Sequence, residues 1–325
     1  MANSSKVARI VLYVLLSLVV VVALGLGFAA RYMLNFSLAP DPNRSDVDSA
    51  YALLYERFPD MKPWVDSVSS NGILRDTFVV MPSGERHHAL YMKADNACGR
   101  TAVFVHGYKD TAVKFLYFAR MYNRDLGYNI LLPELHAHGL SEGDAIQMGW
   151  KDADEVLNWI KVAEEIFRDD NYRTAMIVHG VSMGAATTMN VSGKDLPEYV
   201  NAFVEDCGYT SVWDEFSMQL KEMFGLPAFP LMHSTSLLCN MKYGWNFKEA
   251  SPLISVSRCT RPMLFIHGDA DDFVPFSMMQ PLYDAKPEPK EFWVAPGSAH
   301  ANAYRDHPEE YTAVVRQFLD KWNRP

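Results

Sequence analysis

The stretch HGVSMG at residues 179–184 places a serine between two glycines, one residue removed from each. It follows the apolar run TAMIV (174–178), typical of a buried strand, and precedes small residues that suit a closely packed helix. A G-x-S-x-G pattern at a sharp strand-to-helix turn projects the serine hydroxyl clear of a sheet. The candidate nucleophile is therefore Ser182, and the N–H of Met183 is a candidate oxyanion donor. Because glycine and serine are common, the motif needs support from the rest of the chain.

Strand-like and helix-like patterns alternate through the body of the chain. The expected strands are residues 77–81, 88–94, 101–107, 128–134, 174–180, 202–207, 262–268 and 291–297. Residues 114–127 and 151–168 have helical patterns, and a last helix begins near Pro308. This order predicts an α/β fold with a mostly parallel eight-stranded sheet and helices on both faces. In such sheets ligands bind beyond the carboxyl ends of the strands.

One segment interrupts the alternation. Residues 209–250 contain no clear strand, have a helical pattern and are rich in Met, Phe, Leu and Pro. We predict a small helical cap insertion over the top edge of the sheet; the alternative is an ordinary crossover helix with loops. The cap belongs to a domain at 72–325, which residues 32–71 precede as a linker and a first helix.

The N-terminus carries an uncharged apolar segment at residues 10–30, about 31 Å long as a helix and close to the thickness of a bilayer core. Lys6 and Arg9 precede it, which favours a cytoplasmic N-terminus. Residues 1–31 are thus predicted to be a single-pass transmembrane anchor in the cell membrane, with the body extracytoplasmic. A signal peptide cleaved after small residues near Ala29 is the alternative; its apolar region usually has about 7–15 residues.

Composition narrows the partners. The 325-residue chain has a net charge of −9, which argues against a nucleic-acid partner. It contains neither of the glycine-rich nucleotide-binding motifs, G-x-x-x-x-G-K-[ST] and G-x-G-x-x-G, so we predict no cofactor. The HAH stretch at residues 136–138 offers two histidines without an obvious third ligand, so we predict no metal. The sequence leaves the oligomeric state open.

A serine nucleophile needs a base held by an acid, and this architecture orders them Ser, then Asp or Glu, then His. His300 follows the last expected strand and is the candidate base; its rival His307 has a capping explanation next to Pro308. The acid candidates after the preceding strand are Asp269, Asp271 and Asp272, and Asp206 after an earlier strand is an alternative.

A second oxyanion donor is expected from the loop after the strand at 101–107. That loop begins HGYKD, which assigns the backbone N–H of Tyr108. His106, directly before Gly107, is interpreted as a structural turn residue.

Together these motifs resemble the α/β-hydrolase superfamily over roughly residues 70–323. The resemblance rests on HGY (106–108), LPELHAHGLSEGD (132–144), GVSMG (180–184), HGDADDFVP (267–275) and GSAH (297–300). With its N-terminal segment the chain is similar to membrane-anchored bacterial cell-surface serine hydrolases. The H-G-x-x-D-x-x-V-P pattern favours Asp271 as the acid. Many members have Asp-x-Arg-x-His-Gly after the fourth strand; this chain has Glu134, His136, His138 and Gly139 at those positions, so the Asp and the Arg are replaced.

The resemblance implies a serine hydrolase that works through an acyl-enzyme without a cofactor. We predict cleavage of an ester or related acyl bond in a small-molecule or lipid-like substrate, with the apolar insertion receiving an acyl or aromatic group. A serine peptidase or acyltransferase on the same fold is the alternative enzyme. An inactive, surface-tethered binding protein is the alternative of another class.

Overall fold

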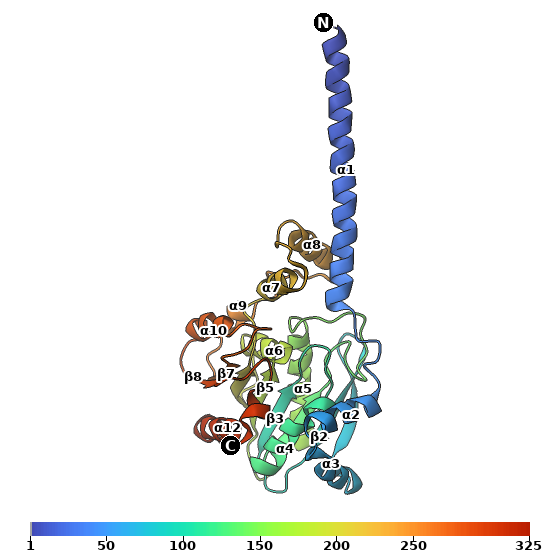
Figure 1. Ribbon diagram of the computed structural model, residues 1–325. Helices are drawn as coiled ribbons and strands as arrows, with labels where there is room; N and C mark the ends of the chain where they lie inside the picture. The colour runs from blue at the N-terminus through green and yellow to red at the C-terminus, as the bar shows by residue number, and fades with distance from the viewer. Residues whose placement is uncertain (1) are drawn as a thin grey trace.

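The computed structural model describes residues 2–325, with side chains from Lys6 onward. Its N-terminal helix α1 (Ala2–Leu38) projects from the body as a single rod (Figure 1). Residues 6–38 are long and apolar enough to cross a membrane. The helix continues past the predicted end of the anchor at residue 31 because Leu34 and Leu38 are buried against the body.

The body contains an eight-stranded sheet, as predicted. Its strands are β1 (Arg75–Val80), β2 (Arg86–Met92), β3 (Arg100–Val105), β4 (Asn129–Pro133), β5 (Ala175–Val181), β6 (Val200–Asp206), β7 (Met263–Gly268) and β8 (Lys290–Ala295). Their order across the sheet is β1-β2-β4-β3-β5-β6-β7-β8. The β1–β2 and β2–β4 pairs are antiparallel and the other pairs are parallel. The carboxyl ends of the parallel strands, and the loops after them, therefore meet at one edge.

Helices cover both faces of the sheet. Alternate strand residues point to opposite faces, so Met176 and Val178 of β5 enter one core while Ile177 enters the other. The first core includes α5 (Asp152–Phe167), α6 (Met183–Ser192), α9 (Pro252–Val256) and α10 (Met279–Ala285). The second includes α2 (Val47–Arg57), α3 (Met61–Ser70), α4 (Leu116–Arg120), α11 (Ala303–Asp306) and α12 (Pro308–Trp322).

Two segments differ from the expected helices. Residues 114–127 form a 3-10 turn (Val113–Phe115), the short α4 and a π-helical turn (Met121–Asp125) instead of one helix. The segment at 32–71, expected to hold a linker and one helix, contains the end of α1 and the two helices α2 and α3. Both helices cover the second core, which gives this segment a packing role.

The predicted cap is a pair of helices between β6 and β7. They are α7 (Val212–Phe224) and α8 (Leu231–Tyr243). Ser211 caps α7 by accepting a hydrogen bond from the N–H of Asp214, and Gly225, with φ of 66°, ends the helix. The pair lies beside the last turns of α1, on the side of the body from which that helix leaves (Figure 1).

Candidate active site

Ser182 occupies a strained turn between β5 and α6. Its φ and ψ are 58° and −119°, a conformation that non-glycine residues rarely adopt. The two glycines of the motif are required by close backbone approach. A Cβ on Gly180 would collide with the carbonyl of Gly184, and a Cβ on Gly184 would collide with the carbonyl of Val105. The turn thus explains why the serine is flanked by glycines.

The structure brings Ser182, His300 and Asp271 together. The hydroxyl of Ser182 donates to Nε2 of His300, with the two atoms 2.8 Å apart. Nδ1–H of His300 donates to Oδ2 of Asp271 over 2.7 Å. Ser182 is 7% exposed and the Asp271 carboxylate is fully buried. One continuous line of hydrogen bonds therefore runs from a hydroxyl through an imidazole to a carboxylate.

The surroundings of Asp271 keep its carboxylate ionised. Oδ1 accepts hydrogen bonds from the backbone N–H groups of Phe273 and Val274, each over 3.0 Å. Nε2 of His267 lies 3.3 Å from Oδ2. Burial raises the pKa of Asp271, but the interactions with His267 and His300 outweigh it and hold the pKa at about 2. His267, which sequence reasoning used only as a pattern marker, thus orients the acid.

Met183 and Tyr108 both line the cavity that contains Ser182. Met183 is the first residue of α6, so its N–H has no acceptor within the helix. The loop carrying Tyr108 passes directly beside the nucleophile: a Cβ on Gly107 would lie 3.7 Å from the Cβ of Ser182. These positions fit two backbone donors converging near the serine.

The other candidates have different partners. Asp206 accepts a hydrogen bond from the hydroxyl of Tyr311 at 3.0 Å, and burial raises its pKa to about 6. Asp269 accepts the N–H of Gly297, and Asp272 is exposed. His307 faces the carbonyl of Pro296. Nε2 of His106 accepts the N–H of Leu135, consistent with a structural turn residue.

Glu134 organises the loops behind the site. Its carboxylate is buried and accepts hydrogen bonds from the N–H groups of Ala112 and Leu140. Oε2 also lies 2.9 Å from Nδ1 of His88 on β2. A Cβ on Gly139 would collide with this carboxylate. The departure from the superfamily pattern at residue 134 therefore keeps a buried acid that joins the loops after β3 and β4.

An apolar cavity of about 300 Å³ opens beside Ser182. The cap contributes about half of its wall. The end of α1 contributes Met33 and Phe36, which the sequence analysis placed in the linker after the anchor. Glu215 of α7 is the acidic residue in this lining; it is 3% exposed, and burial raises its pKa to about 8. The apolar cap residues of the lining are Phe216, Leu220, Met223, Phe224 and Met232.

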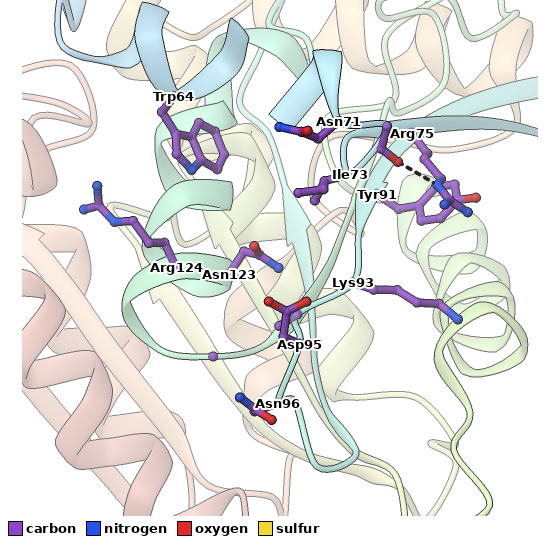
Figure 2. Close-up of a pocket in the computed structure, with 13 residues that line it drawn as sticks. Trp64, Asn71, Ile73, Arg75, Tyr91, Lys93, Asp95, Asn96, Asn123 and Arg124 are labelled. Carbon is purple, nitrogen blue, oxygen red and sulfur yellow. Dashed lines mark hydrogen bonds between the residues drawn. The ribbon is translucent and has the colours of Figure 1, made fainter. Parts of the chain in front are cut away.

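A second cavity, of about 540 Å³, lies at the opposite end of the parallel strands. Polar and charged side chains dominate it, including Arg75, Lys93, Asp95 and Arg124 (Figure 2). Arg75 donates from Nε to the carbonyl of Gly72 at its rim. Its lining contains none of the predicted site residues, so the chemistry predicted from the sequence concentrates at the other end.

The sheet order, the strained serine turn after β5 and the cap after β6 define the α/β-hydrolase fold. No protein-family model matches the chain. The chain is 28% identical over 251 residues to the uncharacterized protein YqkD of Bacillus subtilis, covering 77% of this chain and 81% of that protein. It is 26% identical over 260 residues to the α/β-hydrolase domain-containing protein WAV2 of Arabidopsis thaliana, covering 78% of this chain and 80% of that protein.

Solved structures give the same fold. An esterase of Pyrococcus furiosus, Pf2001, superposes with a TM-score of 0.63 and 20% identity, covering 79% of this chain and 94% of the esterase. An acylaminoacyl peptidase of Pyrococcus horikoshii superposes with a TM-score of 0.57 and 17% identity, covering 78% of this chain and 42% of the peptidase. The fold is thus shared by enzymes named for ester and for peptide substrates.

Proposed function

We propose that the protein is a serine hydrolase that cleaves an ester bond through an acyl-enzyme. The observation that carries the proposal is the hydrogen-bonded line from Ser182 through His300 to Asp271, beside an apolar cavity. A serine hydroxyl is a weak nucleophile, and an imidazole within hydrogen-bond reach can remove its proton as it attacks.

The proposed reaction has two halves. Oγ of Ser182 attacks the acyl carbon, His300 takes the hydroxyl proton at Nε2, and the N–H groups of Tyr108 and Met183 stabilise the oxyanion. His300 then protonates the leaving alcohol, which departs and leaves the acyl group on Ser182. A water molecule then attacks the acyl carbon with His300 as base, and His300 returns the proton to Oγ of Ser182 as the acyl–Oγ bond breaks and the acid is released. The ionised carboxylate of Asp271 stabilises the imidazolium in both halves.

The cavity favours an apolar acyl group. Its wall is largely Met, Phe and Leu side chains, and a volume of about 300 Å³ suits an acyl chain of medium length. Phe36 lies five residues after Arg31, about 7.5 Å further along α1. With α1 as an uncleaved anchor, the mouth of the cavity would lie close to the membrane surface. This supports a lipid-like acyl ester presented from the bilayer on the extracytoplasmic side.

Fluorophosphonate labelling of the full-length protein tests the proposal. We expect one adduct in the wild type and none in Ser182→Ala, with the loss of esterase activity in the same variant. Absence of a Ser182-dependent adduct from folded protein would contradict a hydrolase and favour a tethered binding protein.

Two further measurements address substrate and anchor. Rates on p-nitrophenyl esters of rising chain length, beside aminoacyl anilides, measure acyl preference; we expect medium-chain esters to be preferred. A clear preference for anilides would replace the esterase with a peptidase. Mass spectrometry of the mature N-terminus tests the anchor, because a start near Ala30 would mean cleavage.

A further inference from the structure

Four side chains from three separate stretches of the chain meet outside the hydrolase site. Glu85 lies in the turn before β2, His87 on β2, His136 in the loop after β4 and Glu155 in the first turn of α5. Each offers one nitrogen or oxygen atom, and these atoms all lie within 4.8 Å of one another. The cluster thus gathers two imidazoles and two carboxylates around one point.

The distances within the cluster fit a shared ion. Nδ1 of His87 is 3.2 Å from Oε2 of Glu155. Nδ1 of His136 is 3.1 Å from Oε2 of Glu85 and 3.5 Å from Oε1 of Glu155. Ligands bound tetrahedrally to Zn²⁺ at about 2.0–2.1 Å stand about 3.3 Å from one another. These three contacts, in which Glu155 contributes both carboxylate oxygens, therefore come close to the ligand spacing of a coordination shell.

The buried atoms of the cluster lack hydrogen-bond partners among the described residues. Both ring nitrogens of His87, Nδ1 of His136 and Oε2 of Glu155 have none. His87 is 0% exposed and His136 is 5% exposed. An unpaired buried polar group costs about 1–3 kcal/mol, so several at one point call for a ligand. The contacts to the carboxylates are close, but they do not have hydrogen-bond geometry.

We propose that Glu85, His87, His136 and Glu155 bind a divalent transition-metal ion, with Zn²⁺ the best match. Two imidazoles with two carboxylates form an N/O ligand set that suits Zn²⁺, which is commonly four-coordinate. Calcium and magnesium prefer all-oxygen shells. The side chain of Glu85 is 35% exposed, which gives the ion a route from solvent.

The ion would fasten the β1–β2 hairpin and the loop after β4 to the start of α5. That loop also reaches the hydrolase site: its residue Met148 lines the cavity, and the carbonyl of Met148 accepts the hydroxyl of Tyr209. The role of the ion is structural, and none of the four ligands lines the cavity beside Ser182.

Metal binding to the full-length, tag-free protein in detergent tests the site. After chelator treatment and gel filtration we expect one equivalent of Zn²⁺ to be retained on reloading, measured by elemental analysis. Co²⁺ as the probe should give visible absorption bands of a low-coordinate site, a readout independent of hydrolase activity. Zn²⁺ should also raise the melting temperature.

The variants separate this site from adventitious binding. His87→Ala should abolish the retained equivalent, and Glu155→Gln, close to the native shape, should weaken binding beyond the about 10–100-fold of an outer-shell change. His233→Ala removes an exposed histidine of α8 and should keep full binding. Failure of folded wild type to retain an ion overturns the proposal, as does undiminished binding in folded Glu155→Gln.

Discussion

Nε2 of His138 accepts a hydrogen bond from the backbone N–H of Lys109 over 3.1 Å. Nδ1–H of the same ring donates to the carbonyl of His136 over 2.8 Å, which leaves Nε2 free to accept. Lys109 directly follows Tyr108, the proposed oxyanion donor. A buried imidazole in the loop after β4 therefore fixes the direction of an amide in the loop after β3.

Replacing His138 with alanine should lower kcat without a matching change in KM. Displacing the Tyr108 N–H weakens an interaction that strengthens in the transition state, and we expect a fall of about 10- to 100-fold. Steady-state kinetics on a p-nitrophenyl ester measure it. His138→Gln, whose amide oxygen can accept the Lys109 N–H, should recover part of the rate. A rise in KM with kcat unchanged would assign His138 to substrate binding instead.

Gly184→Ala should destabilise the whole domain. The added Cβ collides with the carbonyl of Val105 on β3, so the serine turn or the strand must move. We expect a loss of at least about 1–3 kcal/mol in the free energy of unfolding, visible as a lower melting temperature. Gly107→Ala is the control, because its Cβ would meet only ordinary contacts of 3.6–3.8 Å. Equal melting temperatures for the two variants would contradict this account.

The sequence was sufficient for the sheet and for the line of three polar residues. Each strand is a short apolar run, and Ser182, Asp271 and His300 each follow a strand whose carboxyl end lies at the same edge. The helical stretch expected at 114–127 is present but irregular, because apolar periodicity does not distinguish a regular helix from consecutive 3-10, α- and π-helical turns.

The cavity had no local signal in the sequence. The proposed metal site had only the HAH stretch at residues 136–138, for which we predicted no metal because no third ligand was near in the sequence. Met33 and Phe36 lie just after the predicted anchor, in a segment expected to be a linker, and only the packing of α1 against the body places them near Ser182. An acid on a helix is ordinarily solvated, so the burial of Glu215 depends on the cap. The cluster around His136 draws on distant stretches, whereas the neighbouring His138 turns to Lys109.

The raised pKa of Glu215, about 8, predicts a change in substrate binding with pH. At pH 7 the carboxyl is protonated; above pH 8 it ionises and places a charge beside the acyl chain. We expect KM for a medium-chain ester to rise several-fold between pH 7 and 9 in the wild type and to stay flat in Glu215→Gln. Initial-rate kinetics across this range measure it, and a parallel rise in both proteins would contradict it.

The same group predicts a trend in stability. The carboxyl has an ordinary pKa of 4.5 and a raised pKa in the folded state, so the folded protein binds its proton more tightly. The free energy of unfolding therefore falls as pH rises from about 4.5 to 8. Melting temperatures of wild type and Glu215→Gln should diverge over this window, with the variant gaining relative to the wild type. A constant difference would show that Glu215 does not titrate there.

The outer surface of the cap predicts contact with the bilayer. Phe229, in the loop before α8, and Leu237 and Met241, on α8, are 72%, 60% and 76% exposed. Figure 1 shows α8 on the side of the body from which α1 leaves. In full-length protein reconstituted into vesicles, Leu237→Ser and Met241→Ser should each lower the rate on a vesicle-bound ester about fivefold. Fully burying such a side chain contributes about 1.5–3 kcal/mol, and partial burial in the bilayer contributes only a part of that free energy. The rate on a soluble short-chain ester should not change. Leu53→Ser on α2, 46% exposed and outside the cap, is the control. Equal losses on both esters would mean that the substitutions disturb the cap rather than its docking on lipid.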